Sequence, residues 1–447
     1  MTDCIAQLDF DFHPETTIHA VFDAPQISSD GGALLLRKID DRLGISARIA
    51  AMLPDCRVQG RVIHSKLEQL RQRLYQIALG YEDCNDADTL RHDPVLKTVC
   101  DRNPEDDLPL SSQPTLSRLE NGVTMREVVD LMKLLEDMYV ASFESPPETV
   151  VLDIDSTDDE THGHQQLAFF HGYYDHHMYH PLLVFDGTDG RLASALLRPG
   201  NVHASRGARA VIRRLIRKLK ARFPEVRILV RGDSGFCVPA MIEEVESLDA
   251  ELGGIDYIFG IAKNPVLLDL ARAATDAAKE RYAFDNAKVR YFSSFSYAAK
   301  TWTRERHVIV KAEHGDKGEN PRFIVTSLVG FDPRTLYDIS YCKRGQCENF
   351  IKDFKNALKA DRLSCCTFVA NSFRLLEHSF AYVLMHALRA EAGRVSPEMA
   401  KSQFDTLRLK LLKVAALVKQ SVRRILIRLP ISFPYKRVFT AVAMGVG

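Results

Sequence analysis

Hydrophobic residues follow one pattern up to about residue 147, and beyond it they gather in short runs. In 64–80 and 124–142 they recur every three to four residues, as on the buried face of a helix. Shorter stretches with this pattern predict helices at 28–43, 86–100 and 115–121, after an extended arm at 1–25. We therefore predict a helical region over 1–147, and the sequence Ser-Pro-Pro at its end marks a domain boundary.

Beyond that boundary, β-branched and apolar runs predict buried strands separated by helices. Strands are expected at about 149–156, 165–172, 179–186, 191–198, 226–232 and 256–262, with helices at 205–222 and 238–250. Three strands followed by alternating helices and strands indicate a mixed sheet with helices on both faces. Further along, the pattern predicts helices at 371–391 and 398–418 and a short strand within SVRRILIRLP, at 421–430.

A third region lies between these parts. Strand-like pieces at 289–298, 305–313 and 322–329 predict a mainly β insertion over 264–335. It holds Trp302, the only tryptophan of the chain. The whole organisation is then a helical region at 1–147, a first core part at 148–263, the insertion, a last core part at 336–392 and a basic region at 393–447.

The stretch at 341–355, YCKRGQCENFIKDFK, carries candidate chemistry on one face of a predicted helix. At about 100° per residue, four polar residues fall within roughly 60° of one another: Tyr341, Arg344, Glu348 and Lys355. A carboxylate between cations stays ionised, which makes it a good ligand for a hard divalent cation. Arg344 and Lys355 suit phosphate oxygens. Taken alone, the stretch also fits an exposed helix with ordinary ion pairs.

Two more acidic residues stand where predicted strands give way to loops. Asp155 ends the strand-like run TVVLDIDST, and Asp233 follows the run VRILVRG. Carboxylates at strand ends, together with one on a later helix, form a plausible site for two metal ions. Asp153 lies two residues before Asp155, on the same strand face, and is the alternative first ligand.

These motifs resemble the bacterial insertion-sequence transposases that carry an Asp-Asp-Glu triad. Within them the chain is similar to the cut-and-paste branch with a Tyr-Arg-Glu-Lys signature, because the gaps from Tyr341 to Lys355 match that signature. DST at 155–157, RGDSGF at 231–236 and LLRPGNVHAS at 196–205 resemble further motifs of the branch. The likeness covers roughly 150–390 well and both ends loosely.

The resemblance implies an RNase H-like α/β fold with flanking helices and a β-rich insertion before the last catalytic helix. It implies that Asp155, Asp233 and Glu348 are catalytic and hold two Mg²⁺ ions, for which Mn²⁺ substitutes. Arg344, Lys355 and Tyr341 would bind DNA beside the scissile bond. Trp302 would be a platform for a flipped base, although a packed strand aromatic fits its setting as well. The expected partners are the inverted-repeat ends of the element, target DNA, and a second copy in a synaptic homodimer.

The charge pattern is compatible with DNA binding although the net charge is zero. The helix at 205–222 has eight basic residues and no acidic one, with Arg213 and Arg217 near its centre. The residues from Lys410 to Arg437 include a second unopposed basic set. Both stretches suit local contacts with phosphates, and both also fit solvated faces. In 1–147, Arg118 lies on a segment that fits a recognition helix or an ordinary capped helix.

Other features narrow the location and the site. Nine cysteines without CxxC spacing favour free thiols in a reducing compartment. The sequence has no apolar run near the roughly 20 residues of a membrane span and no signal peptide, so we expect a cytoplasmic protein, nucleoid-associated in a bacterium. Six histidines between His162 and His180 lack a cysteine partner, which favours surface or polar-core positions over a zinc site.

Two other functions remain open on the sequence. One is a structure-selective nuclease of the same fold, and the other is a catalytically inactive DNA-binding repressor. Retention of all three acids speaks against the second. The sequence of the inverted repeats and the use of a DNA hairpin are not encoded in any motif.

Overall fold

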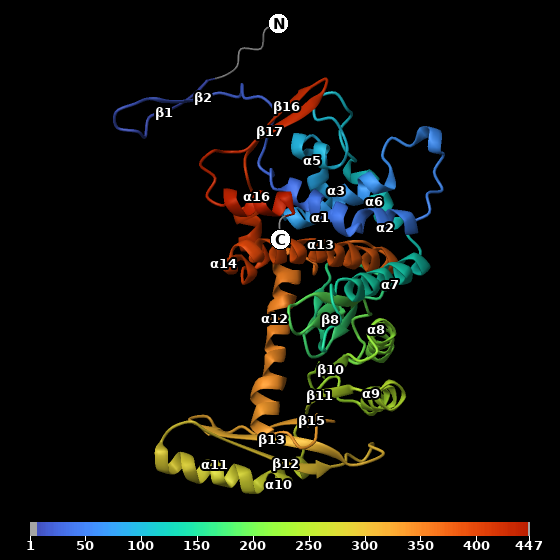
Figure 1. Ribbon diagram of the computed structural model, residues 1–447, viewed down its shortest axis with the longest axis vertical. Coiled ribbons are helices and arrows are strands. Elements are labelled where there is room, and N and C mark those ends of the chain that lie inside the picture. The colour runs from blue at the N-terminus through green and yellow to red at the C-terminus, as the bar shows by residue number, and fades with distance from the viewer. Residues whose placement is uncertain (1–6, 446–447) are drawn as a thin grey trace. The chain divides into compact units, whose positions relative to one another are not determined.

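The computed structural model describes residues 7–445 (Figure 1), so part of the predicted arm at 1–25 lies outside the described residues. The described residues form two compact units. One comprises the residues up to Leu119 together with those from Ala387 onward, and the other runs from Glu120 to His386. Within 7–445 no helix has both the length and the apolar character that a membrane crossing requires.

The first unit is mainly helical. Its helices are α1 (Ala33–Leu43), α2 (Ile45–Met52), α3 (Lys66–Leu79), α4 (Ala87–Leu90), α5 (Pro94–Val99), α14 (Pro397–Ala400), α15 (Phe404–Leu407) and α16 (Lys436–Met444). Helix α3 begins where the Ser65 hydroxyl accepts from the Glu68 amide, and it ends at Gly80 in the left-handed region. The helices α6 (Gln113–Asn121) and α13 (Phe368–Val395) contribute residues to both units.

Two small sheets complete this unit. The strands β1 (Leu8–Phe10) and β2 (Ile18–Ala20) form a hairpin. The strands β17 (Arg424–Arg428), β16 (Ala416–Ser421) and β3 (Ile27–Ser28) form an antiparallel sheet in that order. The helix predicted over 398–418 is therefore wrong in its second half, where α15 and a π-helical turn end at Leu412 and β16 begins. The strand expected within 421–430 is present as β17.

The second unit is built on a nine-stranded mixed sheet. Its order is β12–β13–β15–β11–β10–β4–β8–β9, and β14 pairs with β13. These strands are β4 (Thr149–Ser156), β8 (Leu182–Asp186), β9 (Leu192–Leu196), β10 (Arg227–Gly232), β11 (Ile255–Ile261), β12 (Val289–Tyr297), β13 (Arg306–Gly315), β14 (Gly318–Glu319) and β15 (Arg322–Thr326). Strand β10 runs parallel to both β4 and β11, and the remaining pairs are antiparallel.

Segment 264–335 does not contain strands alone. It also holds α10 (Pro265–Leu270) and α11 (Arg272–Asp285), and its strands β13 and β15 extend the same sheet through β11. The strand predicted over 165–172 is wrong as a member of this sheet. Only β6 (Phe169–His171) forms there, in a separate sheet with β5 (Asp159–Glu160) and β7 (His176–Tyr179).

Alternation along the strands gives the sheet two apolar faces. On β11, Tyr257 and Phe259 pack into a core with α8 (Ala208–Arg222) and α9 (Pro239–Leu252), whereas Ile258 between them packs with Leu336 and Tyr337 on the other face. Figure 1 shows strands of this sheet between α8 and α9 on one side and the rod that contains α12 (Gly345–Lys352) on the other. Helix α7 (Met125–Ala141) packs against β9 and α8. The sheet is thereby covered by helices on both faces, as the sequence predicts.

Candidate active site

The helical rod that carries the Tyr-Arg-Glu-Lys signature is not a uniform α-helix. It consists of a π-helical turn at Thr335–Tyr341, a 3₁₀ turn at Cys342–Arg344, the α-helix α12 and a second π-helical turn at Asp353–Ala357. The single α-helical wheel assumed from the sequence is therefore wrong in detail. The 3₁₀ turn has three residues per turn, so it stacks Arg344 beneath Tyr341. Each π-helical turn contains a signature residue, Tyr341 in the first and Lys355 in the second, and π-helical turns are frequent at functional sites.

Asp155 and Asp233 lie side by side because the strands that carry them are neighbours. Strands β4 and β10 are parallel, and Ile154 is paired with Gly232, so the next residue on each is an aspartate. One oxygen of each carboxylate is fixed by a backbone amide: Asp155 Oδ1 accepts from Ser156 at 2.9 Å, and Asp233 Oδ1 accepts from Gly235 at 2.8 Å. The second oxygen of each is left to face the site.

Those two second oxygens meet the same guanidinium nitrogen. Arg344 Nη2 lies 2.8 Å from Asp155 Oδ2 and 3.7 Å from Asp233 Oδ2. A positive charge thus sits where two carboxylates converge, which is the position a hard cation would favour. Burial raises the pKa of Asp155 to about 6, with Arg344 opposing the shift and Asp233 and Glu348 adding to it.

Glu348 is exposed on the first turn of α12. Its charge is near enough to contribute to the raised pKa of Asp155. Within residues 7–445, however, no three acidic, histidine or cysteine side chains come close enough to hold a metal ion together. The structure therefore brings Asp155, Asp233 and Arg344 into direct contact and leaves Glu348 at the edge of this group. The donor set of carboxylate oxygens fits Mg²⁺ in kind, with two of the three acids converging.

Asp153 has a different environment from Asp155. It is 0% exposed and forms a two-point ion pair with Arg231, at 2.6 Å to Nε and 2.7 Å to Nη2. The Arg231 guanidinium also donates to the Ser340 carbonyl at 2.5 Å. A side chain at Gly187 would collide with this pair, since its Cβ would lie 2.5 Å from Asp153 Oδ2. Both oxygens of Asp153 are thus engaged by one arginine.

Tyr341 lies against the strand end that carries Asp233. A Cβ added at Gly260 would be 2.6 Å from the Tyr341 hydroxyl and 3.0 Å from the Ser234 amide nitrogen. The absence of a side chain at Gly260 is therefore what admits the phenol. Burial raises the pKa of Tyr341, and Arg344 opposes the shift. The hydroxyl stays protonated at neutral pH and can donate a hydrogen bond.

Lys355 joins the helix to the loop that follows Asp155. Its ammonium donates to the Asp158 carbonyl at 2.8 Å and to Asp158 Oδ1 at 3.0 Å, and it lies 4.0 Å from Asp361 Oδ2. The neighbouring Asp159 is 1% exposed, and within the described residues neither of its oxygens has a hydrogen-bond partner. Burial and the nearby Asp361 raise the pKa of Asp159 well above its usual range.

The other predicted DNA-binding residues lie on elements other than those that carry Asp155, Asp233 and Glu348. Arg213 on α8 forms a two-point ion pair with Glu244 of α9, and Arg217 on α8 lies 2.7 Å from Glu251 of α9. Trp302 is half-buried in the loop between β12 and β13. The ring of Trp302 meets Tyr297 edge-on at 5.5 Å and lies beneath the Arg306 guanidinium at 5.1 Å.

Arg198 is a structural residue of this site that the sequence did not identify, although LLRPGNVHAS includes it. It is buried, and burial lowers its pKa to about 9. Its guanidinium donates to the carbonyls of His180, Ala204 and Arg206 at 2.5–2.9 Å and to the Ser156 hydroxyl at 3.0 Å. It therefore ties the loop at 198–206 to the residue that follows Asp155. A buried arginine inside a motif, with no acidic neighbour in sequence, is the signal that points to such a role.

Paired aspartates at adjacent strand ends, with an arginine, a phenol and a further acid on one helical rod, are typical of enzymes that transfer phosphoryl groups. Residues 10–446 match the family model described as transposase DDE domain, group 1. Since the match spans nearly the whole chain, the chain belongs to the DDE transposases. It is accordingly an enzyme of DNA transposition, in a family that generally uses divalent metal ions.

Among curated proteins, none matches this chain. Among solved structures, a cryo-EM structure of the piggyBac transposase synaptic complex with hairpin DNA is similar at 10% sequence identity. The similarity covers 85% of this chain and 81% of that chain, with a TM-score of 0.40.

Proposed function

We propose that this transposase binds the terminal inverted repeats of its own insertion sequence and moves it by metal-dependent cleavage and strand transfer, in a cut-and-paste reaction. The observation that carries the proposal is the single cationic group of Arg344 between Asp155 and Asp233. Two carboxylates that converge on one cation, each with its other oxygen fixed by a backbone amide, form a preorganised set of ligands for a metal ion.

We also propose that the core is RNase H-like. In chain order, the strands β4, β8, β9, β10 and β11 are first to fifth, and they lie in the sheet as third, second, first, fourth and fifth. Only β8 runs opposite to the other four, because it pairs antiparallel with both β4 and β9. This order supports an RNase H-like core, with 264–335 inserted between β11 and the rod that carries Glu348.

Asp155, Asp233 and Glu348 would hold two Mg²⁺ or Mn²⁺ ions. When bound, the ions supply Lewis acidity to the attacking and leaving oxygens of the phosphoryl transfer. Asp155 is preferred to Asp153 as first ligand, because Arg231 already engages both oxygens of Asp153. When DNA binds, the Arg344 guanidinium leaves the carboxylates of Asp155 and Asp233 and contacts a DNA phosphate. The Tyr341 hydroxyl donates a hydrogen bond to the same DNA backbone. Lys355 would contact phosphate from its position beside Asp158.

The remaining contacts are proposed on the same grounds. Arg213 and Arg217 are exposed, and each would contact a phosphate with the part of its guanidinium that its acidic partner leaves open. Trp302 would stack on a base if its loop opened. The helical region at 1–147 and the basic region at 393–447 would bind the ends, and two copies would hold the two ends together. A nucleoid-associated protein of a bacterial cytoplasm fits this function.

The decisive experiment separates chemistry from binding with Glu348→Gln. This change keeps size and hydrogen bonding but removes the charge that holds a metal ion. End binding should persist, or tighten as repulsion of phosphate falls, while cleavage with Mg²⁺ should be lost. Glu280→Gln, an equal change at an exposed position of α11, is the matched control and should cut normally. Near wild-type cleavage by Glu348→Gln would overturn the triad.

Terminal inverted repeats bounded by a short target duplication around the gene would distinguish transposition from a nuclease of the same fold.

A further inference from the structure

The β16–β17 hairpin of the first unit separates its side chains into two chemically different faces. The register pairs Lys419 with Leu426, Ser421 with Arg424 and Leu417 with Arg428. Directly paired residues of an antiparallel hairpin lie on the same face, and alternate residues do as well. Lys419, Arg424 and Arg428 therefore share one face, and all three are exposed. Strand β17 is also the outer strand of its sheet.

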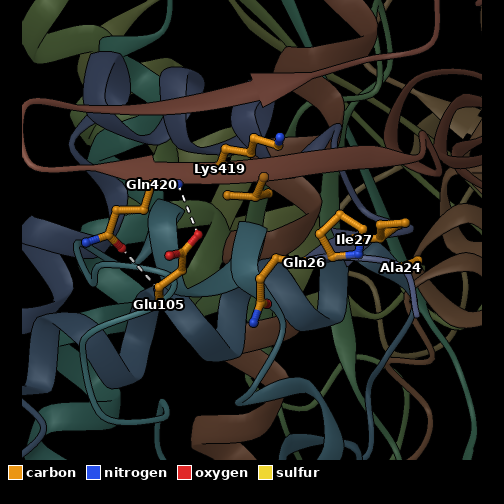
Figure 2. A pocket seen from close by; sticks show the side chains of 8 residues that line it. Ala24, Gln26, Ile27, Glu105, Lys419 and Gln420 are labelled. Carbon is orange, nitrogen blue, oxygen red and sulfur yellow. Dashed lines mark hydrogen bonds between the residues drawn. The ribbon is translucent and has the colours of Figure 1, made fainter. Parts of the chain in front are cut away.

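The opposite face attaches the hairpin to its own unit. Val418 is 1% exposed, and Gln420 exchanges two hydrogen bonds with Glu105, at 3.0 and 3.1 Å (Figure 2). Gln420 also donates to Asp106. A groove of about 560 Å³ borders this face, lined mainly by 24–27, Glu105 and 418–420. Gln420 thus engages Glu105 and Asp106 by hydrogen bonds, and within residues 7–445 neither acid forms an ion pair with Lys419, which also lines the groove.

The outer cations have no acidic partners. Within residues 7–445, none of Lys419, Arg423, Arg424 and Arg428 forms an ion pair. The basic helix α8 differs, because carboxylates of α7 and α9 meet Arg209, Arg213, Arg214, Arg217 and Lys218. Four clustered positive charges without counter-charges favour a polyanion as their partner.

The tip of the hairpin adds an apolar side chain to this charge. Val422 is fully exposed, and Arg423 and Arg424 follow it directly. The Ser421 hydroxyl donates to the Arg424 carbonyl at 3.0 Å, which closes the turn. Proteins that bind the minor groove of DNA combine arginines with small apolar wedges in this way. Along β17, Arg424 and Arg428 are about 13 Å apart, which is on the scale of the DNA grooves.

We propose that the hairpin is a DNA-binding wing. Its outer face lies on the phosphates of a duplex through Lys419, Arg424 and Arg428, and its tip places Val422 and Arg423 in the minor groove. This inference rests on the proposed function and deepens it, because it assigns a DNA contact to one element of the first unit. The narrow minor groove of A·T-rich DNA attracts arginine, so the wing should favour such sequence near the element's ends.

The first test is the double substitution R424A/R428A in the full-length protein, measured by binding to a fluorescent duplex at several salt concentrations. Loss of two phosphate contacts should weaken binding about tenfold or more and reduce the slope of log affinity against log salt by about 2. The matched control is R272A/R281A, which removes two exposed arginines of α11 that are already paired with Asp269 and Asp285. It should leave both quantities unchanged. Thermal melting of all three proteins checks that they are equally folded.

The second test locates the tip of the β16–β17 hairpin on the bound DNA. Val422→Cys carrying a tethered iron chelate should cut both strands of the bound duplex in a minor-groove pattern, above the background of identically treated wild-type protein with its native thiols. Wild-type affinity of R424A/R428A, or no cutting above background from position 422, would overturn the wing. An altered oligomeric mass with unchanged DNA affinity would also overturn it and assign β17 to pairing between copies. If wild-type protein bound no duplex at all, the proposed function would fail together with the wing; normal wild-type binding with unaffected variants removes the wing alone.

Discussion

Asp153 and Asp155 lie two residues apart on one face of β4, and both meet an arginine, yet their surroundings differ in kind. Asp153 uses both oxygens on Arg231, with no water-exposed surface, and Gly187 closes over the pair. Asp155 uses one oxygen on Arg344, which it shares with Asp233. Within the described residues, the buried Nε of Arg344 has no partner.

The difference teaches which ion pair belongs to the scaffold and which can be exchanged. A two-point buried pair loses far more when one partner is removed than it contributes over an apolar substitute, because the remaining charge is left without solvent. The Asp155–Arg344 pair has one contact, an unused donor on Arg344 and the carboxylate of Asp233 nearby. Breaking this pair to bind a phosphate or a metal ion therefore costs less free energy. We expect variants of Arg231 to change stability and variants of Arg344 to change function.

The largest effect should come from Arg231→Ala. It leaves the carboxyl group of Asp153 buried and without its partner, so the free energy of unfolding should fall by about 3–5 kcal/mol. Chemical denaturation measures this. The double variant R231M/D153L should recover most of the loss, because apolar residues of similar volume replace a buried pair at little cost. A fall of less than about 1 kcal/mol for Arg231→Ala would remove the distinction between the two pairs.

Arg344→Ala should have the next largest effect, on function. Loss of a charge-assisted phosphate contact costs about 1.5–3 kcal/mol, which corresponds to roughly 10- to 150-fold weaker engagement of the cleavage site. Competition binding with an end that includes the cleavage site, against one that stops short of it, isolates this contribution. Arg334→Ala is the control, since Arg334 is an exposed arginine directly before the rod, with Asp332 and Asp338 beside it. Equal losses with both ends would contradict a local phosphate contact.

Asp159 is a buried acid whose oxygens have no hydrogen-bond partner within the described residues. The effect of its substitution on stability should depend on pH. Its pKa is raised in the folded protein, so the folded state holds a proton that the unfolded state releases above about pH 4. Stability from this group is present at low pH and is lost as pH rises toward the raised pKa. Asp159→Asn cannot ionise. It should therefore melt a few degrees above wild type at pH 8 and close to wild type near pH 4. A difference that grew toward low pH would contradict the sign.

The smallest effect should come from R213A/R217A on α8. Exposed ion pairs contribute about 0–1 kcal/mol each, so stability should change little. Binding should weaken a few-fold for all DNA sequences alike and depend less on salt, but less than with R424A/R428A, because Glu244 and Glu251 already neutralise these arginines. The reciprocal variant E244Q/E251Q should tighten binding. A loss confined to the cognate end would indicate base reading instead.

Local sequence patterns were enough to predict the acids but not their partners. A strand that ends in an acidic residue places that residue at a sheet edge, which is why Asp155 and Asp233 could be expected to meet. The wheel of 341–355 set Arg344 beside Glu348, yet the direction in which Arg344 points depends on the 3₁₀ and π-helical turns around it. Those turns have no simple signature in the order of residues.

Pairing between distant segments was also hidden. The strand-like character of 305–313 and 322–329 predicts strands, but it does not say that β13 and β15 join β11. Residues 416–418 fall in a stretch with a helical pattern, yet they form a strand that pairs with β17 and, almost 400 positions earlier, with β3. The sequence pattern of α8 also did not show that its arginines pair with acidic residues, because Glu244 and Glu251 belong to the next helix.

Gly187 limits how this protein can evolve. Even the methyl group of alanine would press on the Asp153–Arg231 pair, so any substitution at this position would disturb a buried ion pair between β4 and β10. The residue lies in a surface turn after β8, where insertions and substitutions normally accumulate freely. We expect relatives of this chain that keep the aspartate and the arginine of this pair to keep a glycine in this turn as well.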